Sequence, residues 1–288
     1  MTRLSDWNTD VEIQWCPGCP NFGILQAFKL AMVDLGIQPH KLCVVSGIGQ
    51  AAKFPHYVKA NFFNGLHGRA LPAALAIHAA NPDLTTIVVT GEGDCYGEGG
   101  NHFIHTLRRN PNLTLVVHNN GYYALTKGQA SPTTPIGQTR AIHLRGVESA
   151  PLQTLAIAIA QDCGFVARGF AGDIEHLKSL LLEGIRHEGF SYIDVIQPCI
   201  TWGKRPLSWY RERIDRISAD HDPTDRLAAL EMALDSGERM SIGVLYRNSR
   251  RPLFGERFRR EVTGKPLASL PWADQNKIEG FLAEFRRD

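Results

Sequence analysis

The chain has 288 residues, of which 43% are hydrophobic, and a formal net charge of +2 at pH 7. This length allows one full α/β core with an extension, and so small a net charge argues against a nucleic acid as the partner. The polar first ten residues contain neither a signal-peptide apolar region nor a membrane-spanning stretch, so we expect a cytoplasmic protein that does not bind membranes.

Hydrophobic periodicity predicts that helices and strands alternate along most of the chain. The predicted helices cover residues 22–35, 68–80, 101–109, 152–161 and 174–185. The predicted strands cover residues 41–46, 85–89, 113–117, 165–169 and 192–196, and residues 47–66 are predicted to be a loop. This alternation favours an α/β fold with a doubly wound parallel sheet over a sandwich or a bundle.

The pattern weakens beyond Pro206. A helix over 224–234 and a strand over 242–246 are expected there, and the final forty residues are charged and punctuated by prolines. Few apolar residues remain to build a second core. We therefore predict one domain at residues 1–205 and a C-terminal extension at 206–288 that packs on a partner subunit. The locally basic run 247–260 is interpreted as a solvated or subunit-facing surface.

The strongest functional signal lies between two predicted strand ends. Gly91-Glu92-Gly93-Asp94 stands at the end of one apolar strand and Asn119-Asn120 at the end of the next. Parallel sheets bind ligands beyond the carboxyl ends of their strands, where glycines let backbone N–H groups come close to a phosphate. Magnesium takes oxygen ligands, so the two strand ends are predicted to hold one magnesium diphosphate. The alternative is a plain strand-to-helix turn with solvated acids.

Two cysteines are close enough in sequence to share one metal centre. Cys16 and Cys19 are separated by two residues, and Cys199 follows the last predicted strand. Thiolates select iron–sulfur clusters or zinc, although a redox-inert turn is also consistent with this spacing. Cys43 and Cys163 are expected to be small buried hydrophobic residues.

Several motifs together resemble one enzyme family. Glu92 and Asn120 stand 28 positions apart, and this pair is similar to the thiamine diphosphate motif, a GDG run followed by an NN pair. Further motifs are Trp15-Cys16-Pro17-Gly18-Cys19, Ser46-Gly47-Ile48-Gly49, Leu66-His67-Gly68-Arg69, Gly99-Gly100-Asn101-His102, Thr126-Lys127-Gly128-Gln129 and Gln197-Pro198-Cys199. Over residues 10–205 the chain resembles the β subunit of 2-oxoacid:ferredoxin oxidoreductases.

The resemblance implies thiamine diphosphate and Mg²⁺ as cofactors. Glu92 and Asn120 would supply side-chain oxygens to the ion, and Tyr122 its backbone carbonyl. Glutamate at position 92 departs from the family's aspartate, and Asp94 could compensate for the longer side chain. The full set of implied cofactor-binding positions is Gly49, His67, Gly68, Gly91, Glu92, Gly93, Asp94, Asn120, Tyr122, Leu125 and Thr126.

The resemblance also implies a [4Fe–4S] cluster held by Cys16, Cys19, Cys199 and one more cysteine. Gln50 stands where the family has that further cysteine. Cys43, Cys95, a histidine or an exogenous ligand could complete the site, or the cluster could be labile, three-iron or absent. The fourth ligand is therefore left open.

The implied activity is the coenzyme A-linked oxidative decarboxylation of a 2-oxoacid, with electrons passing through the cluster to ferredoxin. His67 is a candidate for a hydrogen bond to the reacting group, and the ammonium groups of Lys53 and Lys127 favour 2-oxoglutarate over pyruvate. An α subunit would carry the pyrimidine-binding domain. The alternatives are the β half of a non-redox thiamine diphosphate-dependent 2-oxoacid decarboxylase, and a non-catalytic paralogue.

Overall fold

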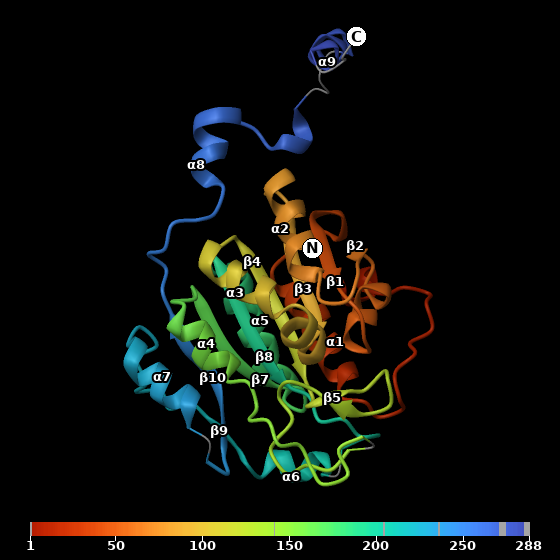
Figure 1. The fold of residues 1–288 in the computed structure, drawn as a ribbon, viewed down its shortest axis with the longest axis vertical. Helices are drawn as coiled ribbons and strands as arrows, with labels where there is room; N and C mark the ends of the chain where they lie inside the picture. Colours follow the sequence, from red (N-terminus) through yellow and green to blue (C-terminus); the bar gives the residue numbers. More distant parts are fainter. Residues whose placement is uncertain (1, 141, 204, 236, 271–274, 285–288) are drawn as a thin grey trace.

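Eight strands form one sheet in the computed structural model, which describes residues 2–140, 142–203, 205–235, 237–270 and 275–284. Their order is β2-β1-β3-β4-β8-β7-β10-β9 (Figure 1). Their bounds are β1 Leu42–Ser46, β2 Asn61–Asn64, β3 Thr85–Gly91, β4 Leu113–Asn119, β7 Phe165–Phe170, β8 Phe190–Ile196, β9 Ile214–Arg216 and β10 Met240–Arg247. Neighbouring strands are parallel except β10, which runs antiparallel to β7. The predicted α/β fold is confirmed, with one antiparallel strand added.

Helices cover both faces of this sheet. Their bounds are α1 Asn21–Asp34, α2 Ala70–Ala80, α3 Gly100–Arg109, α4 Thr154–Ala160, α5 Ile174–Arg186, α6 Leu207–Arg211, α7 Arg226–Leu234, α8 Glu256–Phe258 and α9 Gln275–Ala283. α1 and α5 pack side by side on one face, whereas α2, α3, α4 and α7 contribute to the core on the other. None of the helices in the described segments is both long and apolar enough to cross a membrane.

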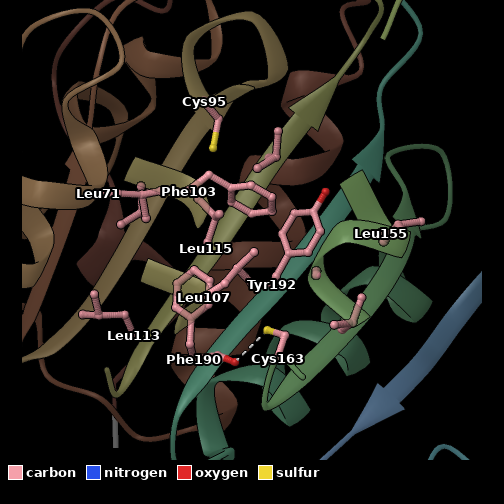
Figure 2. Packing of buried hydrophobic residues seen from close by; sticks show 14 of the residues in the cluster. Leu71, Cys95, Phe103, Leu107, Leu113, Leu115, Leu155, Cys163, Phe190 and Tyr192 are labelled. Atoms are coloured by element: carbon pink, nitrogen blue, oxygen red, sulfur yellow. Dashed lines mark hydrogen bonds between the residues drawn. The ribbon is translucent and has the colours of Figure 1, made fainter. Parts of the chain in front are cut away.

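Alternating side chains of the strands divide the core into two layers. On β1, Cys43 and Val45 join the layer under α2 and α3, whereas Val44 joins the layer under α1. Figure 2 shows the first layer, where Cys95 and Cys163 lie among Leu71, Phe103 and Phe190. The Cys163 thiol donates to the carbonyl of Phe190 at 3.3 Å. Cys43 and Cys163 are buried in the core, as predicted.

The predicted loop 47–66 is wrong in part, because it contains a 3₁₀-helix, Ala51–Tyr57, and the edge strand β2. β2 pairs with β1 through the main chain, and all four of its side chains are exposed. Its residues, Asn-Phe-Phe-Asn, therefore show no alternation from which a strand could be predicted. The sequence also did not indicate the π-helix Gly93–Glu98 or the hairpin of β5, Tyr122–Tyr123, with β6, Gln129–Ala130.

Part of the predicted extension belongs to the main sheet. β9 and β10 extend the sheet beyond β7, and α7 packs against α4. The basic run is not simply a solvated or subunit-facing surface, because Arg251 donates to the carbonyls of Leu107, Arg108 and Asp162, each at 2.9 Å. A cation at the C-terminal end of a helix such as α3 is favourable. Contact between residues 206–288 and a partner subunit stays a prediction.

A buried polar network lies at the centre of the sheet, beside the carboxyl end of β4. The Asp194 carboxylate accepts hydrogen bonds from Asn119 Nδ2 at 3.1 Å and from the Tyr96 hydroxyl at 3.3 Å. Burial raises the pKa of Asp194, while the charge of the half-buried Arg168 opposes that rise. The Tyr96 hydroxyl also contacts that of Tyr192 at 2.5 Å. This network fixes the side chain of Asn119.

We expect Asp194→Ala to lower the free energy of unfolding by about 3 kcal/mol, because Asn119 and Tyr96 lose their acceptor and Arg168 loses a nearby opposite charge. Asp194→Asn is the matched control, since its amide oxygen can still accept from Asn119, and it should cost less. Urea denaturation of the purified protein measures both. An alanine variant as stable as the wild type would show that the network does not stabilise the sheet.

Candidate active site

The candidate site lies where the carboxyl ends of β1, β3, β4 and β8 meet. Because these strands are parallel, the segments that follow them gather at one edge of the sheet. Gly91 ends β3, Gly93 begins the π-helix, and Asn119 ends β4. β5 and α6 lie at this end of the molecule, and α8 lies at the opposite end (Figure 1). The predicted meeting of the two strand ends is thus present in the fold.

Asp94 joins the loop after β1, the loop before α2 and the end of β3 through one buried carboxylate. Oδ1 accepts from the Gly68 nitrogen at 2.7 Å, the Ile48 nitrogen at 3.1 Å and His67 Nδ1 at 2.6 Å. Oδ2 accepts from the Thr90 hydroxyl at 2.5 Å. Since this carboxylate is filled by donors from the chain, Asp94 is a structural acid here rather than a free ligand that could compensate for Glu92.

Two glycines are required for this arrangement. A Cβ on Gly47 would lie 2.1 Å from Asp94 Oδ2, and a Cβ on Gly68 would lie 2.4 Å from the carbonyl oxygen of Glu98. Gly68 also has a φ of +71°, which side-chain-bearing residues rarely adopt. The loop after β1 and the loop before α2 can therefore approach the π-helix only with glycine at these positions.

Glu92 and Asn120 converge on one backbone N–H. The Tyr122 nitrogen lies 2.9 Å from Glu92 Oε1 and 2.9 Å from Asn120 Oδ1. Glu92 Oε2 also accepts from the Asn120 nitrogen at 3.4 Å. The Glu92 side chain is buried, and desolvation raises its pKa to about 7. A buried carboxylate without a counter-charge, close to an amide oxygen, fits a hard cation such as Mg²⁺.

His67 lies beside Asp94. Its Nδ1 bonds to Asp94, so Nε2 is the nitrogen that remains for a ligand, and the side chain is 40% exposed. The ring is in edge contact with that of Tyr123, with centroids 6.2 Å apart. A carboxylate that holds one imidazole nitrogen fixes both the orientation and the tautomer of the ring.

The two predicted lysines line different cavities. Lys53 borders a cavity of about 390 Å³ that Gly49 and Leu125 also line. Lys127 borders a different cavity, of about 340 Å³. The structure therefore does not bring the two lysines to one pocket. The Thr126 hydroxyl donates to Gln129 Oε1 at 2.6 Å within the β5–β6 turn.

The three predicted cluster cysteines lie close together at the same edge of the sheet. The Thr201 hydroxyl donates to Cys16 Sγ at 3.2 Å, and the Trp202 nitrogen donates to Cys199 Sγ at 3.4 Å. Burial raises the pKa of Cys19 to about 11, and the neighbouring Cys16 and Cys199 add to the rise. Cys43 and Cys95 lie in the core layer on the other face, so neither is placed to be the fourth ligand.

These thiols do not form a site for a single metal ion. Among the described residues, no three His, Cys, Asp or Glu side chains lie close enough together to hold one ion. A cluster is wider than an ion, and each thiolate binds a different iron. Gln50 lies beside this group: its carbonyl accepts from Trp15 Nε1 at 2.8 Å, next to Cys16, and its buried Oε1 has no hydrogen-bond partner among the described residues.

Gln197 links the two candidate centres. Its Oε1 accepts from Asn120 Nδ2 at 3.0 Å, and its Nε2 lies 3.7 Å from Cys19 Sγ. The sequence contained Gln197 in a recognisable motif, Gln-Pro-Cys, but gave no reason to assign this residue a role. The contacts of Gln197 with Asn120 and Cys19 depend on the fold, because strand pairing places β8, which precedes Gln197, beside β4.

Comparison with known proteins points to the same chemistry. Residues 45–195 match the family described as "Thiamine pyrophosphate enzyme, C-terminal TPP binding domain". Residues 199–261 match a second family, which describes the C-terminal part of the pyruvate ferredoxin oxidoreductase beta subunit. The first match holds every residue discussed at the ends of β3 and β4, and the second begins at Cys199.

Individual proteins are similar over nearly the whole chain. The "2-oxoacid:ferredoxin oxidoreductase 2, subunit beta" of Aeropyrum pernix is 37% identical, over 97% of this chain and 95% of its own. The "2-oxoacid:ferredoxin oxidoreductase subunit beta" of Saccharolobus solfataricus is 40% identical, over 96% and 93%. A solved structure, 2-oxoglutarate:ferredoxin oxidoreductase from Magnetococcus marinus with 2-oxoglutarate, coenzyme A and succinyl-CoA bound, has a TM-score of 0.88 at 34% identity, covering 97% of this chain and 96% of that one.

The raised pKa of Glu92 predicts an opposite pH dependence for metal-free and metal-loaded protein. In the metal-free fold Glu92 holds its proton more tightly than in the unfolded chain, so stability falls by about 3 kcal/mol as pH rises from 4.5 to about 7. Mg²⁺ needs the carboxylate, so its affinity falls as pH drops below about 7.

Thermal unfolding with and without Mg²⁺ at about pH 5 and about pH 8 measures both effects. Glu92→Gln is the control, because the amide has a similar shape and does not titrate. It should show no Mg²⁺-induced stabilisation at either pH. Equal stabilisation of the wild type and this variant by Mg²⁺ would exclude Glu92 as a ligand.

Proposed function

The chain belongs to the β subunits of the 2-oxoacid:ferredoxin oxidoreductases, and on that basis we propose that it binds thiamine diphosphate and Mg²⁺ and acts on 2-oxoglutarate. The observation that carries this proposal is the convergence of Glu92 and Asn120 on the Tyr122 nitrogen. The buried, uncompensated Glu92 supports a cation there, as does the neighbouring amide oxygen of Asn120.

Thiamine diphosphate supplies the carbanion chemistry for decarboxylation, and the chain provides binding and orientation. Glu92, Asn120 and the Tyr122 carbonyl would hold the metal, and Gly91 and Gly93, which end β3 and begin the π-helix, stay proposed phosphate contacts. Asp94 fixes His67 through Nδ1, so that Nε2 of the neutral ring can accept a hydrogen bond from the reacting group. Gly49, Gly68, Leu125 and Thr126 stay proposed cofactor contacts.

We propose further that Cys16, Cys19 and Cys199 hold an iron–sulfur cluster, which would supply the electron exit to ferredoxin. Their shared location and their mutual effect on the pKa of Cys19 support this set. The unsatisfied Gln50 Oε1 beside Trp15 is consistent with a side chain that faces the cluster in place of a cysteine. The contacts of Gln197 with Asn120 and Cys19 support two centres that lie next to each other.

The proposed substrate and partners rest on the similarity to known proteins. The 2-oxoglutarate and coenzyme A in the Magnetococcus marinus structure, together with a 38% identical "2-oxoglutarate synthase subunit KorB" of Archaeoglobus fulgidus, favour a coenzyme A-linked reaction of 2-oxoglutarate. A β subunit implies an α subunit, which we propose contacts residues 206–288 in a cytoplasmic complex. The relatives favour this oxidoreductase over the non-redox decarboxylase half, and thiamine binding would exclude a non-catalytic paralogue.

Anaerobic purification of the native complex, with thiamine, iron and sulfide analysis and EPR of the reduced sample, tests the cofactors. We expect thiamine and about four iron atoms in this subunit. Cys199→Ser should reduce the iron content while leaving thiamine bound, because Cys199 is not among the proposed ligands of Mg²⁺ or thiamine diphosphate. Thiamine without iron in the wild-type subunit would instead favour the decarboxylase alternative.

Lys127→Ala should raise the KM for 2-oxoglutarate by about 10- to 100-fold, because a charge-assisted contact to the second carboxylate is lost. Pyruvate has no second carboxylate, so its KM should change little. Steady-state ferredoxin reduction by the assembled complex measures both values. Lys59→Ala, an exposed lysine outside both cavities, is the control. Equal effects of Lys127→Ala on the two substrates would remove Lys127 from substrate recognition.

A further inference from the structure

Arg140 is a buried cation beside the candidate active site, and its exposed fraction is 7%. The guanidinium donates to the Thr139 carbonyl at 3.0 Å, to the Gly121 carbonyl at 3.5 Å and to the Gln138 side chain. Its Nε has no hydrogen-bond partner, and no ion pair within the described residues includes it. A buried charge without a counter-charge is costly, so this environment favours an anion.

The guanidinium borders an open space of ligand size. The cavity of about 340 Å³ is lined by Arg140 together with Tyr122, Lys127, Gly128, Thr139, Leu144 and Trp202. Arg140 lies over the Tyr122 ring, 3.9 Å from its centroid, which fixes the plane of the guanidinium. Glu92 and Asn120 meet at the nitrogen of this same Tyr122. The cavity therefore adjoins the proposed metal site.

A constrained turn holds a second cation at this cavity. Lys127 has a φ of +78°, a left-handed conformation that is unusual for a residue with a side chain. Gly128 follows with a φ of +91°, and a Cβ there would lie 2.9 Å from the Trp202 ring. Trp202 Nε1 donates to the Ala124 carbonyl at 3.1 Å and so holds the turn in place. Backbone strain that the surroundings maintain in this way is typical of functional sites.

We propose that Arg140 and Lys127 form a two-cation subsite for an anionic group of a ligand that occupies the active site. The planar guanidinium can bind a carboxylate or a phosphate with two parallel hydrogen bonds, and the lysine adds a point charge. This proposal deepens the function proposed above and rests on it. The anionic group is either the second carboxylate of a 2-oxo dicarboxylate or a phosphate of coenzyme A, since both present paired oxygens.

Kinetics of the assembled complex distinguish the two sources. If the subsite takes the substrate carboxylate, Arg140→Gln raises the KM for 2-oxoglutarate about tenfold or more and leaves that for pyruvate unchanged. If it takes a phosphate, the same variant raises the KM for coenzyme A with both 2-oxoacids. Arg140→Lys keeps the charge but cannot donate two parallel hydrogen bonds. Its KM for the affected ligand should lie between those of the wild type and the glutamine variant. Unchanged KM values for all three ligands would overturn the proposal.

A binding measurement without turnover separates this subsite from the proposed function. Calorimetric titration of the assembled complex with succinate, and separately with coenzyme A, should show one of the two weakened about tenfold or more by Arg140→Gln. Arg186→Gln, which removes an exposed charge at the end of α5, is the control and should bind both normally. If Arg140→Gln weakens binding of either ligand but the complex does not oxidise 2-oxoacids, only the proposed function is rejected. If the complex oxidises 2-oxoacids but Arg140→Gln binds both ligands as tightly as the wild type, only the subsite is rejected.

Discussion

The carboxylate of Asp94 determines the geometry of the candidate active site. It accepts hydrogen bonds from Ile48, His67, Gly68 and Thr90, so the segments that follow β1, precede α2 and end β3 share one buried anchor. Hydrogen bonds of this kind stabilise a charged carboxylate. Glu92, two residues earlier, accepts from backbone donors of the neighbouring loop, and its pKa is raised. The two acids of one short loop therefore have different surroundings: Asp94 joins segments of the chain, and Glu92 is the acid proposed to bind the metal.

The sequence allowed the prediction of those features that depend on local pattern. Apolar runs located β3 and β4, and parallel-sheet geometry placed their ends together, so Glu92 and Asn120 were predicted as neighbours. Features that depend on pairing between distant segments could not be predicted. β2 has exposed side chains and is held by main-chain hydrogen bonds, and β10 joins the sheet beside β7 although it lies far along the chain. The partners of Asp94 and the cavities that Lys53 and Lys127 line also depend on such pairing. From the sequence alone, Asp94 was therefore interpreted as a metal ligand that could compensate for Glu92, and the two lysines were expected to act together.

Proximity of the two proposed centres follows from one amide side chain. Gln197 follows β8, and its two polar atoms face Asn120 and Cys19. Because β8 pairs with β4, its end lies beside the end of β4, and the chain continues from this end directly to Cys199. A cofactor held at Asn120 and an iron–sulfur cluster held at Cys19 would therefore be near neighbours, since only the Gln197 side chain lies between these two residues. The order of strands, more than any single motif, provides this arrangement.

The two asparagines at the end of β4 have separate sets of partners. Asn119 bonds to Asp194 and Thr133 inside the protein, whereas Asn120 bonds to Gln197 and Tyr122 at the surface of the site. Two identical neighbours are thus under different constraints, Asn119 from folding and Asn120 from the proposed metal site. During divergence, a descendant that gave up its cofactor could change Asn120 freely and would still need Asn119. Loss of the second asparagine alone would therefore mark a chain that has kept its architecture and abandoned its chemistry.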